Sequence, residues 1–113
     1  MRFAIMLGLA LISVWAVADD DTAVTAGQAI YSQTCIACHG ANGKGAIPGV
    51  ADLTKGDGAL SKPDETLLNS ITEGFQSPGS ALAMPPNGGN PTLAEEDVKA
   101  VLAYLRAAFG RSG

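Results

Sequence analysis

Cys35, Cys38 and His39 form the sequence Cys-Ile-Ala-Cys-His, and they are the only cysteines and the only histidine of the 113-residue chain. Two thiols three residues apart can reach two vinyl groups on one side of a porphyrin and form thioether bonds with them. The histidine that follows is then held beneath the iron as an axial ligand. The pattern predicts one covalently attached c-type haem per chain, attached at Cys35 and Cys38 and ligated by His39.

Three other uses of this pattern are less compatible with its surroundings. A thioredoxin-like dithiol expects a strand before it and a helix after it, whereas here a helical pattern precedes and a Gly-rich segment follows. A structural zinc ion needs four ligands, and the chain has no further Cys or His. A plain disulfide would leave His39 without a role.

Met84 is the predicted sixth ligand of the iron. It is the only methionine outside the first six residues, and it lies in a loop directly before Pro85 and Pro86. Two prolines stiffen the backbone there and fix the direction of the thioether. Ligation by two histidines of one chain is impossible because His39 is the only histidine. A five-coordinate iron remains as an alternative, as does ligation by a lysine, for which the candidates are Lys44, Lys55 and Lys62.

The N-terminal segment has the pattern of a secretory signal peptide. Arg2 precedes an almost unbroken apolar run over residues 3–17, and Ala-Val-Ala at residues 16–18 forms a small-residue cleavage site before three aspartates. We therefore expect residues 1–18 to be removed after Ala18, leaving residues 19–113 as one domain in the periplasm. An uncleaved anchor is the alternative, but the run is shorter than the ~20 residues of a spanning helix.

The charge of the chain bears on its partners. Removal of Arg2 leaves six basic and eleven acidic residues, a net charge of −5 before any cofactor. This balance argues against nucleic acid, whose phosphates attract Lys and Arg. It favours redox partners that present a basic patch, although solubility alone would also account for it. We expect a monomer with no stable membrane insertion after cleavage.

Three helices joined by long loops are predicted, and no segment alternates convincingly as a strand. A capping pattern at residues 25–28 predicts a first helix over residues 26–34. A second helix begins near Pro63, has Leu67, Leu68 and Ile71 on one face and ends at Gly74. The last begins at residues 92–95 and ends at Gly110. So small a domain usually needs a large bound group to complete its core. The loops over residues 40–60 and 75–91 are expected to fold around the haem.

The chain resembles the small bacterial class I cytochromes c, which hold a single haem through His and Met. The resemblance rests on Cys35, Cys38 and His39, on Met84-Pro85-Pro86-Asn87 and on the terminal helix with Val101 and Tyr104. It implies an all-α fold in which the first helix, with Gly27 and Tyr31, crosses the last. It also implies that the carbonyl of Pro48 accepts the Nδ1–H of His39, and that Asn87 donates a hydrogen bond near Met84 or a haem propionate. A second cysteine pair and a tryptophan near the propionates, found in some relatives, are absent.

Iron held by an imidazole and a thioether has no open position, which predicts a single-electron carrier with a positive midpoint potential rather than an enzyme. A peroxidase-like protein would need an open iron and a distal base, and the chain has no second histidine. A dedicated haem subunit of a larger dehydrogenase or oxidase would use the same chemistry, so this alternative stays open.

Overall fold

A computed structural model describes residues 8 and 20–110 of the chain. Apart from Gly8, the predicted signal peptide lies outside these residues, as does its cleavage after Ala18. The described part is mostly helical, which confirms the predicted all-α class. Its helices are α1 (Asp20–Ile30), the π-helical turn η1 (Tyr31–Cys35), α2 (Ile36–His39), the 3₁₀ turn η2 (Ala59–Ser61), α3 (Asp64–Glu73), the 3₁₀ turn η3 (Pro86–Gly89) and α4 (Glu95–Phe109). Among the described residues, no helix is both long enough and apolar enough to cross a membrane.

The first helix is longer at both ends than its sequence pattern predicted. It begins at Asp20, and the hydroxyl of Thr25 donates to the carbonyl of Asp21 instead of capping a helix start. It then continues through η1 into α2, where the N–H of Ile36 donates to the carbonyl of Tyr31 five residues back. The π turn lets the helix run on to His39, so the cysteine pattern itself is helical.

The two later helices lie where they were predicted. α3 begins directly after Pro63 and ends at Gly74, with Leu67 buried. α4 begins after Ala94, whose N–H donates to the Asp97 carboxylate at 2.8 Å, and it ends at Gly110. An acidic side chain in the first turn of a helix satisfies a free N–H and interacts favourably with the helix dipole.

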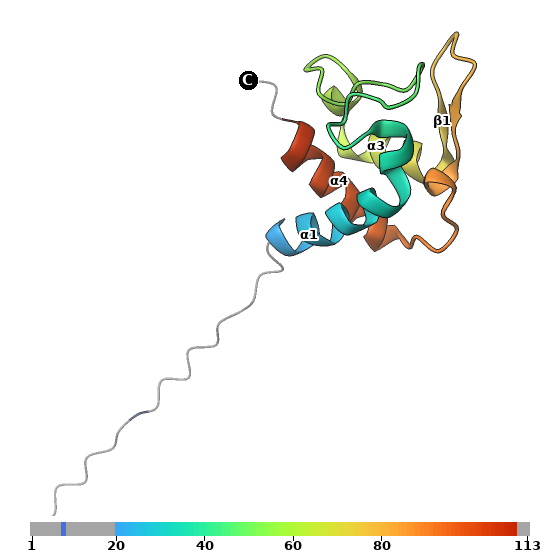
Figure 1. Cartoon of the computed structure of the whole chain (residues 1–113). Coiled ribbons are helices and arrows are strands. Elements are labelled where there is room, and N and C mark those ends of the chain that lie inside the picture. Colours follow the sequence, from blue (N-terminus) through green and yellow to red (C-terminus); the bar gives the residue numbers. More distant parts are fainter. Residues whose placement is uncertain (1–7, 9–19, 111–113) are drawn as a thin grey trace, which may run out of the picture.

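α1 and α4 cross at Gly27 (Figure 1). A Cβ atom at this position would lie 2.0 Å from the carbonyl oxygen of Ala100 and 2.9 Å from the Cβ of Tyr104. Only glycine lets the two backbones approach so closely. The core built around this crossing consists of Tyr31, Leu53, Leu60, Leu67, Val101, Leu102, Leu105 and Phe109.

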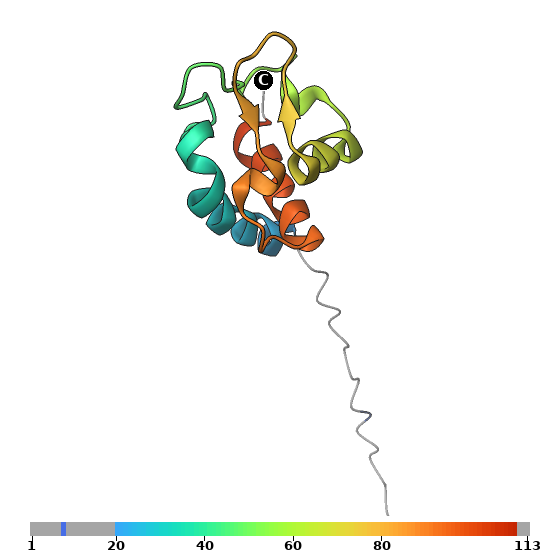
Figure 2. The same ribbon diagram turned by 90° about the vertical axis from the view of Figure 1, so that its right-hand side faces the viewer.

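A short hairpin, which the sequence did not predict, joins α3 to η3. Its strands are β1 (Phe75–Gln76) and β2 (Ala83–Met84), antiparallel, with Phe75 opposite Met84. The strands were missed because two residues are too few to show an alternating pattern. Figure 2 shows the hairpin between the segment that contains α2 on one side and α3 on the other.

Candidate haem-binding site

The predicted attachment and ligand residues converge on one cavity. It has a volume of about 220 Å³, and Cys35, Cys38, His39 and Met84 all line it. The first three come from the end of the long first helix and Met84 comes from β2, so the fold brings together residues more than forty positions apart. Most of the remaining lining is apolar. It includes Leu53 of the loop after α2, Leu60 of η2, Leu67 and Ile71 of α3, and Val101, Leu102 and Leu105 of α4.

The backbone after His39 folds back onto the attachment residues. Gly40 has φ +81°, which ends α2 and turns the chain. The N–H of Gly45 then donates to the carbonyl of His39, and the N–H of Ala46 to that of Cys38, both at 2.8 Å. These bonds satisfy free carbonyls at the end of α2 and hold the Gly-rich loop beside the cavity.

Burial sets the protonation of His39. Loss of solvent lowers the pKa of its imidazole below the usual 6.5, so the ring is neutral at neutral pH. A neutral ring nitrogen is what a metal ion needs from histidine. Nδ1 of His39 is buried and has no hydrogen-bond partner among the described residues.

The two cysteines are free thiols in this structure, with Cys35 half-buried and Cys38 exposed. Burial, and to a lesser extent the nearby Cys38, raise the pKa of the Cys35 thiol to about 11. Redox-active dithiols need a thiolate near neutral pH, which requires a lowered pKa. The environment of Cys35 therefore disfavours a thioredoxin-like use of the pair, and it leaves both sulfurs beside an apolar cavity.

Gly74 and an amide–hydroxyl pair position the segment that contains Met84. Gly74 has φ +87°, and a Cβ atom there would lie 2.7 Å from the carbonyl oxygen of Met84. Beyond η3, the side chain of Asn90 donates to the hydroxyl of Thr34 at 3.2 Å, which ties this segment to the helix of the cysteines. Neither contact was predicted from the sequence. The position of Gly74 after a helix was the only signal, and it indicated a helix end rather than a close approach.

The two residues named only by resemblance lie at the margin of the site. Pro48 is exposed, is not among the cavity-lining residues, and its carbonyl forms no hydrogen bond to His39 in this structure. Asn87 has φ +53°, and its buried Oδ1 has no hydrogen-bond partner within the described part of the chain. It lines a second cavity between α3 and α4. Their predicted roles stay predictions. Of the three lysines considered as alternative ligands, Lys62 lines the cavity, and Lys44 and Lys55 do not.

The donor set and the cavity fit a covalently bound haem. Two thiols, a neutral imidazole and a thioether all line a cavity whose other walls are mainly aliphatic. Imidazole and thioether are the axial donors of electron-transferring c-type haems, and the apolar walls match the faces of a porphyrin.

Known proteins that resemble this chain are c-type cytochromes. A family model described as cytochrome c oxidase, cbb3-type, subunit III matches residues 22–105. Cytochrome c6 of Gracilaria tenuistipitata var. liui is 40% identical over 80 residues, which are 71% of this chain and 68% of that protein. Cytochrome c-555 of Prosthecochloris aestuarii is 31% identical over 81 residues, or 70% of this chain and 81% of that protein. The cbb3-type cytochrome c oxidase subunit CcoP of Rhodobacter capsulatus is 30% identical over 92 residues, or 80% of this chain.

These matches first define a class: a small monohaem class I cytochrome c, with a covalently bound haem c. The chain belongs to the family described as cytochrome c oxidase, cbb3-type, subunit III. It spans only 31% of the length of the CcoP subunits that it matches.

Proposed function

We propose that this protein is an exported electron carrier of the periplasm, with its haem attached to Cys35 and Cys38 and its iron ligated by His39 and Met84. The observation that supports these assignments best is the convergence of all four side chains on one apolar cavity. The bound haem supplies a one-electron Fe(III)/Fe(II) couple. His39 and Met84 would hold the iron, and an imidazole and a thioether can both stay bound when its charge changes.

The side chains of the site favour the reduced state. The thioether of Met84 is a soft donor, which stabilises Fe(II) over Fe(III). The aliphatic walls from α3 and α4 exclude water and so disfavour the additional charge of Fe(III). Both effects raise the midpoint potential, which we expect to be positive. A strongly negative midpoint in a redox titration would contradict the assignment of Met84.

The ligand assignments are tested by a spectrum and a mass. We expect the exported wild-type protein to carry one haem mass and to bind CO slowly when reduced. Met84→Ala should retain the haem but bind CO rapidly, because it opens the sixth position. Gln76→Ala changes an exposed residue of the same hairpin that does not line the cavity, so it is the matched control and should behave as wild type. Rapid CO binding by the wild type would refute ligation by Met84.

An uncharged rim surrounds part of the cavity and is the proposed contact surface for redox partners. We define this neutral rim as residues 45–51 and 75–85, which contain no Asp, Glu, Lys or Arg. Its exposed apolar side chains are Ile47, Phe75 and Leu82. The two segments are neighbours, since a Cβ atom at Gly49 would lie 3.9 Å from the Cβ of Leu82. Uncharged apolar contact is typical of the centre of a protein interface.

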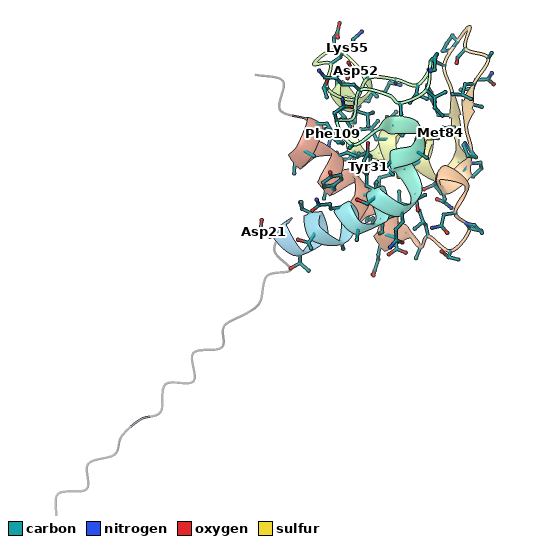
Figure 3. All side chains as sticks on the ribbon, viewed as in Figure 1. Asp21, Tyr31, Asp52, Lys55, Met84 and Phe109 are labelled. Carbon is teal, nitrogen blue, oxygen red and sulfur yellow. The ribbon has the colours of Figure 1, made fainter. Side chains whose placement is uncertain are left out.

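Acidic residues lie outside the neutral rim, where they can steer a basic partner. The first turns of α3 and α4 are acidic. Figure 3 places Asp21 at the N-terminal end of α1, away from the loop with Asp52 and Lys55. We expect association rates with a basic partner to fall with salt, because charges at the periphery act mainly on the encounter.

Electron self-exchange tests the rim without a known partner. The rate between oxidised and reduced copies, measured by NMR line broadening, should fall roughly tenfold in Ile47→Glu, because a charge would be desolvated at the contact. Ile47 is exposed and does not line the cavity, so the substitution leaves the haem site unchanged. Glu96→Gln changes a charge by the same amount in the first turn of α4 and should leave the rate within about threefold. Equal effects of the two substitutions would exclude the rim as the contact surface.

A haem subunit of a larger complex is the second candidate. It is favoured by the family match and by the similarity to CcoP, a subunit of a cbb3-type oxidase. The relatives named cytochrome c6 and cytochrome c-555 match over most of their own length, which favours a separate carrier. Co-purification distinguishes them: a shuttle leaves the membrane fraction at physiological salt, whereas a subunit remains with its complex.

Export is tested by the N-terminus of the mature protein. We expect the periplasmic product to begin at Asp19, after removal of residues 1–18. Recovery of the protein with residues 3–17 intact in the membrane fraction would indicate an anchor instead. Sedimentation of the same material should give a monomer.

A further inference from the structure

The proposed ligation by His39 and Met84 leaves one charged group of the cavity without a role: the ammonium group of Lys62. Of the residues that line the cavity, Lys62 alone has a cationic side chain, and none of them is acidic. It lies between η2 and α3, and its Nζ is 4.6 Å from the centroid of the Phe75 ring. Among the described residues it forms no ion pair with a carboxylate.

The backbone of Lys62 is held on both sides. Arg106 of α4 donates to the carbonyl of Leu60 and to the carbonyl of Lys62, each at 3.0 Å, and its guanidinium pairs with the Asp64 carboxylate at 2.6 Å. This arrangement fixes where the Lys62 side chain starts. It also pairs Arg106 with the carboxylate of Asp64, two residues along the chain from Lys62, so the ammonium group remains available to another anion.

A haem brings such an anion to the cavity, because its porphyrin ends in two propionate carboxylates. A carboxylate at the mouth of an aliphatic cavity is costly unless a cation or hydrogen-bond donors compensate it. A tryptophan that could donate to a propionate is missing from residues 20–110.

We propose that Lys62 is the haem-carboxylate-binding residue of this chain, its ammonium group pairing with a propionate while Arg106 positions the backbone from which it extends. This assignment rests on the proposed haem site. The contact with Phe75 holds the ammonium group at the cavity, since a cation is attracted to the face of an aromatic ring.

The proposal is tested on the haem-loaded protein by the midpoint potential at low ionic strength. Lys62→Gln removes one positive charge near the haem, which stabilises Fe(III). We expect the Fe(III):Fe(II) ratio at a given potential to rise roughly fivefold. This corresponds to a midpoint potential about 40 mV lower, at 59 mV per tenfold change in the ratio. Lys55→Gln makes the same change in the loop outside the cavity lining and should shift the ratio less than about twofold.

Two further outcomes decide between charge and packing. Lys62→Arg keeps the charge, so its midpoint potential should be close to that of the wild type. At a given potential, its Fe(III):Fe(II) ratio should lie within about twofold of the wild-type ratio. Lys62 variants should fold, because Lys62 is exposed and Arg106 binds its carbonyl, which every substitution retains. Equal shifts for Lys62→Gln and Lys55→Gln, or no recovery in Lys62→Arg, would overturn the proposal.

The same samples separate this proposal from the one on which it rests. If the wild type carries one covalent haem and binds CO slowly, the haem site stands, and an unshifted potential in Lys62→Gln then refutes the role of Lys62 alone. If the wild type carries no covalent haem, both proposals fail together.

Discussion

Replacing Gly74 by alanine should loosen the segment that contains Met84. Gly74 has φ +87° and ψ 165°, a conformation that residues with a side chain rarely adopt. The new Cβ atom would also lie 2.7 Å from the carbonyl oxygen of Met84 and 3.1 Å from the nitrogen of Pro86. Both of these atoms belong to the backbone, so the contact can be relieved only by moving the segment.

The cost has two parts. The backbone conformation costs about 1–3 kcal/mol for a residue other than glycine. The overlap with Met84 adds about 1–3 kcal/mol, as overpacking does in well-packed interiors. We therefore expect the free energy of unfolding to fall by about 2–6 kcal/mol, with the second part acting on the Met84 segment itself.

A matched control isolates that second part. Gly79 in the turn of the hairpin has φ +79°, but a Cβ atom there would have nothing within 4 Å. Gly79→Ala therefore tests the backbone strain without the overlap. The assay is the affinity of the oxidised protein for added imidazole, which binds iron only when Met84 has left it.

If about 2 kcal/mol of the cost falls on the Met84 segment, imidazole should bind about 30-fold more tightly to Gly74→Ala than to wild type. Gly79→Ala should bind it within about threefold of wild type. Equal affinities in the two variants would show that Gly74 does not position Met84. A rise in imidazole affinity without loss of stability would refute the steric argument.

Three further predictions concern the helices around the site. Burial raises the pKa of Tyr31 to about 12, so the folded state keeps a proton that the unfolded state loses near pH 10. The free energy of unfolding of the wild type should therefore fall as the pH rises from 10 to 12. In Tyr31→Phe, which lacks this group, it should fall less steeply. Gly27→Ala forces a Cβ atom to within 2.0 Å of the carbonyl oxygen of Ala100 and should cost about 3 kcal/mol in urea unfolding. Arg106→Gln should cost about 1–2 kcal/mol through its lost hydrogen bonds, whereas Lys99→Gln, which breaks only an exposed pair, should cost less than about 0.5 kcal/mol.

The parts of the fold that the sequence predicted well are those with local signals. α4 has apolar residues at helical spacing, an acidic first turn and a glycine after its end, so its bounds followed directly. α3 was predicted equally well from Pro63 and Gly74. The start of α1 was misplaced because Thr25 resembles a capping residue, while its hydroxyl in fact bonds within the helix. Nothing local distinguishes the two uses of a threonine.

The site divides in the same way. Cys35, Cys38 and His39 are adjacent in sequence, so their convergence on one cavity needed no knowledge of the fold. Met84 could be predicted as the sixth ligand because residues 7–113 contain no other methionine and the chain has no second histidine. The contacts that hold it, from Gly74 and between Asn90 and Thr34, join distant segments. Such contacts depend on the tertiary fold, and a single sequence does not show them.

The distribution of charge connects the site with the proposed function. Composition alone indicated an acidic protein and said nothing of where the charge lies. In the structure, the acidic residues of α3 and α4 lie in first turns, where they stabilise the helices. The two segments of the neutral rim contain no charge, and Lys62 is the single cationic residue lining the cavity. With this arrangement, the acidic residues outside the neutral rim can attract a basic partner, and the rim can form the contact. The ammonium group of Lys62, at the cavity, can then pair with a haem propionate. Affinity for a partner and haem potential should therefore respond to different substitutions, the first to Ile47→Glu and the second to Lys62→Gln.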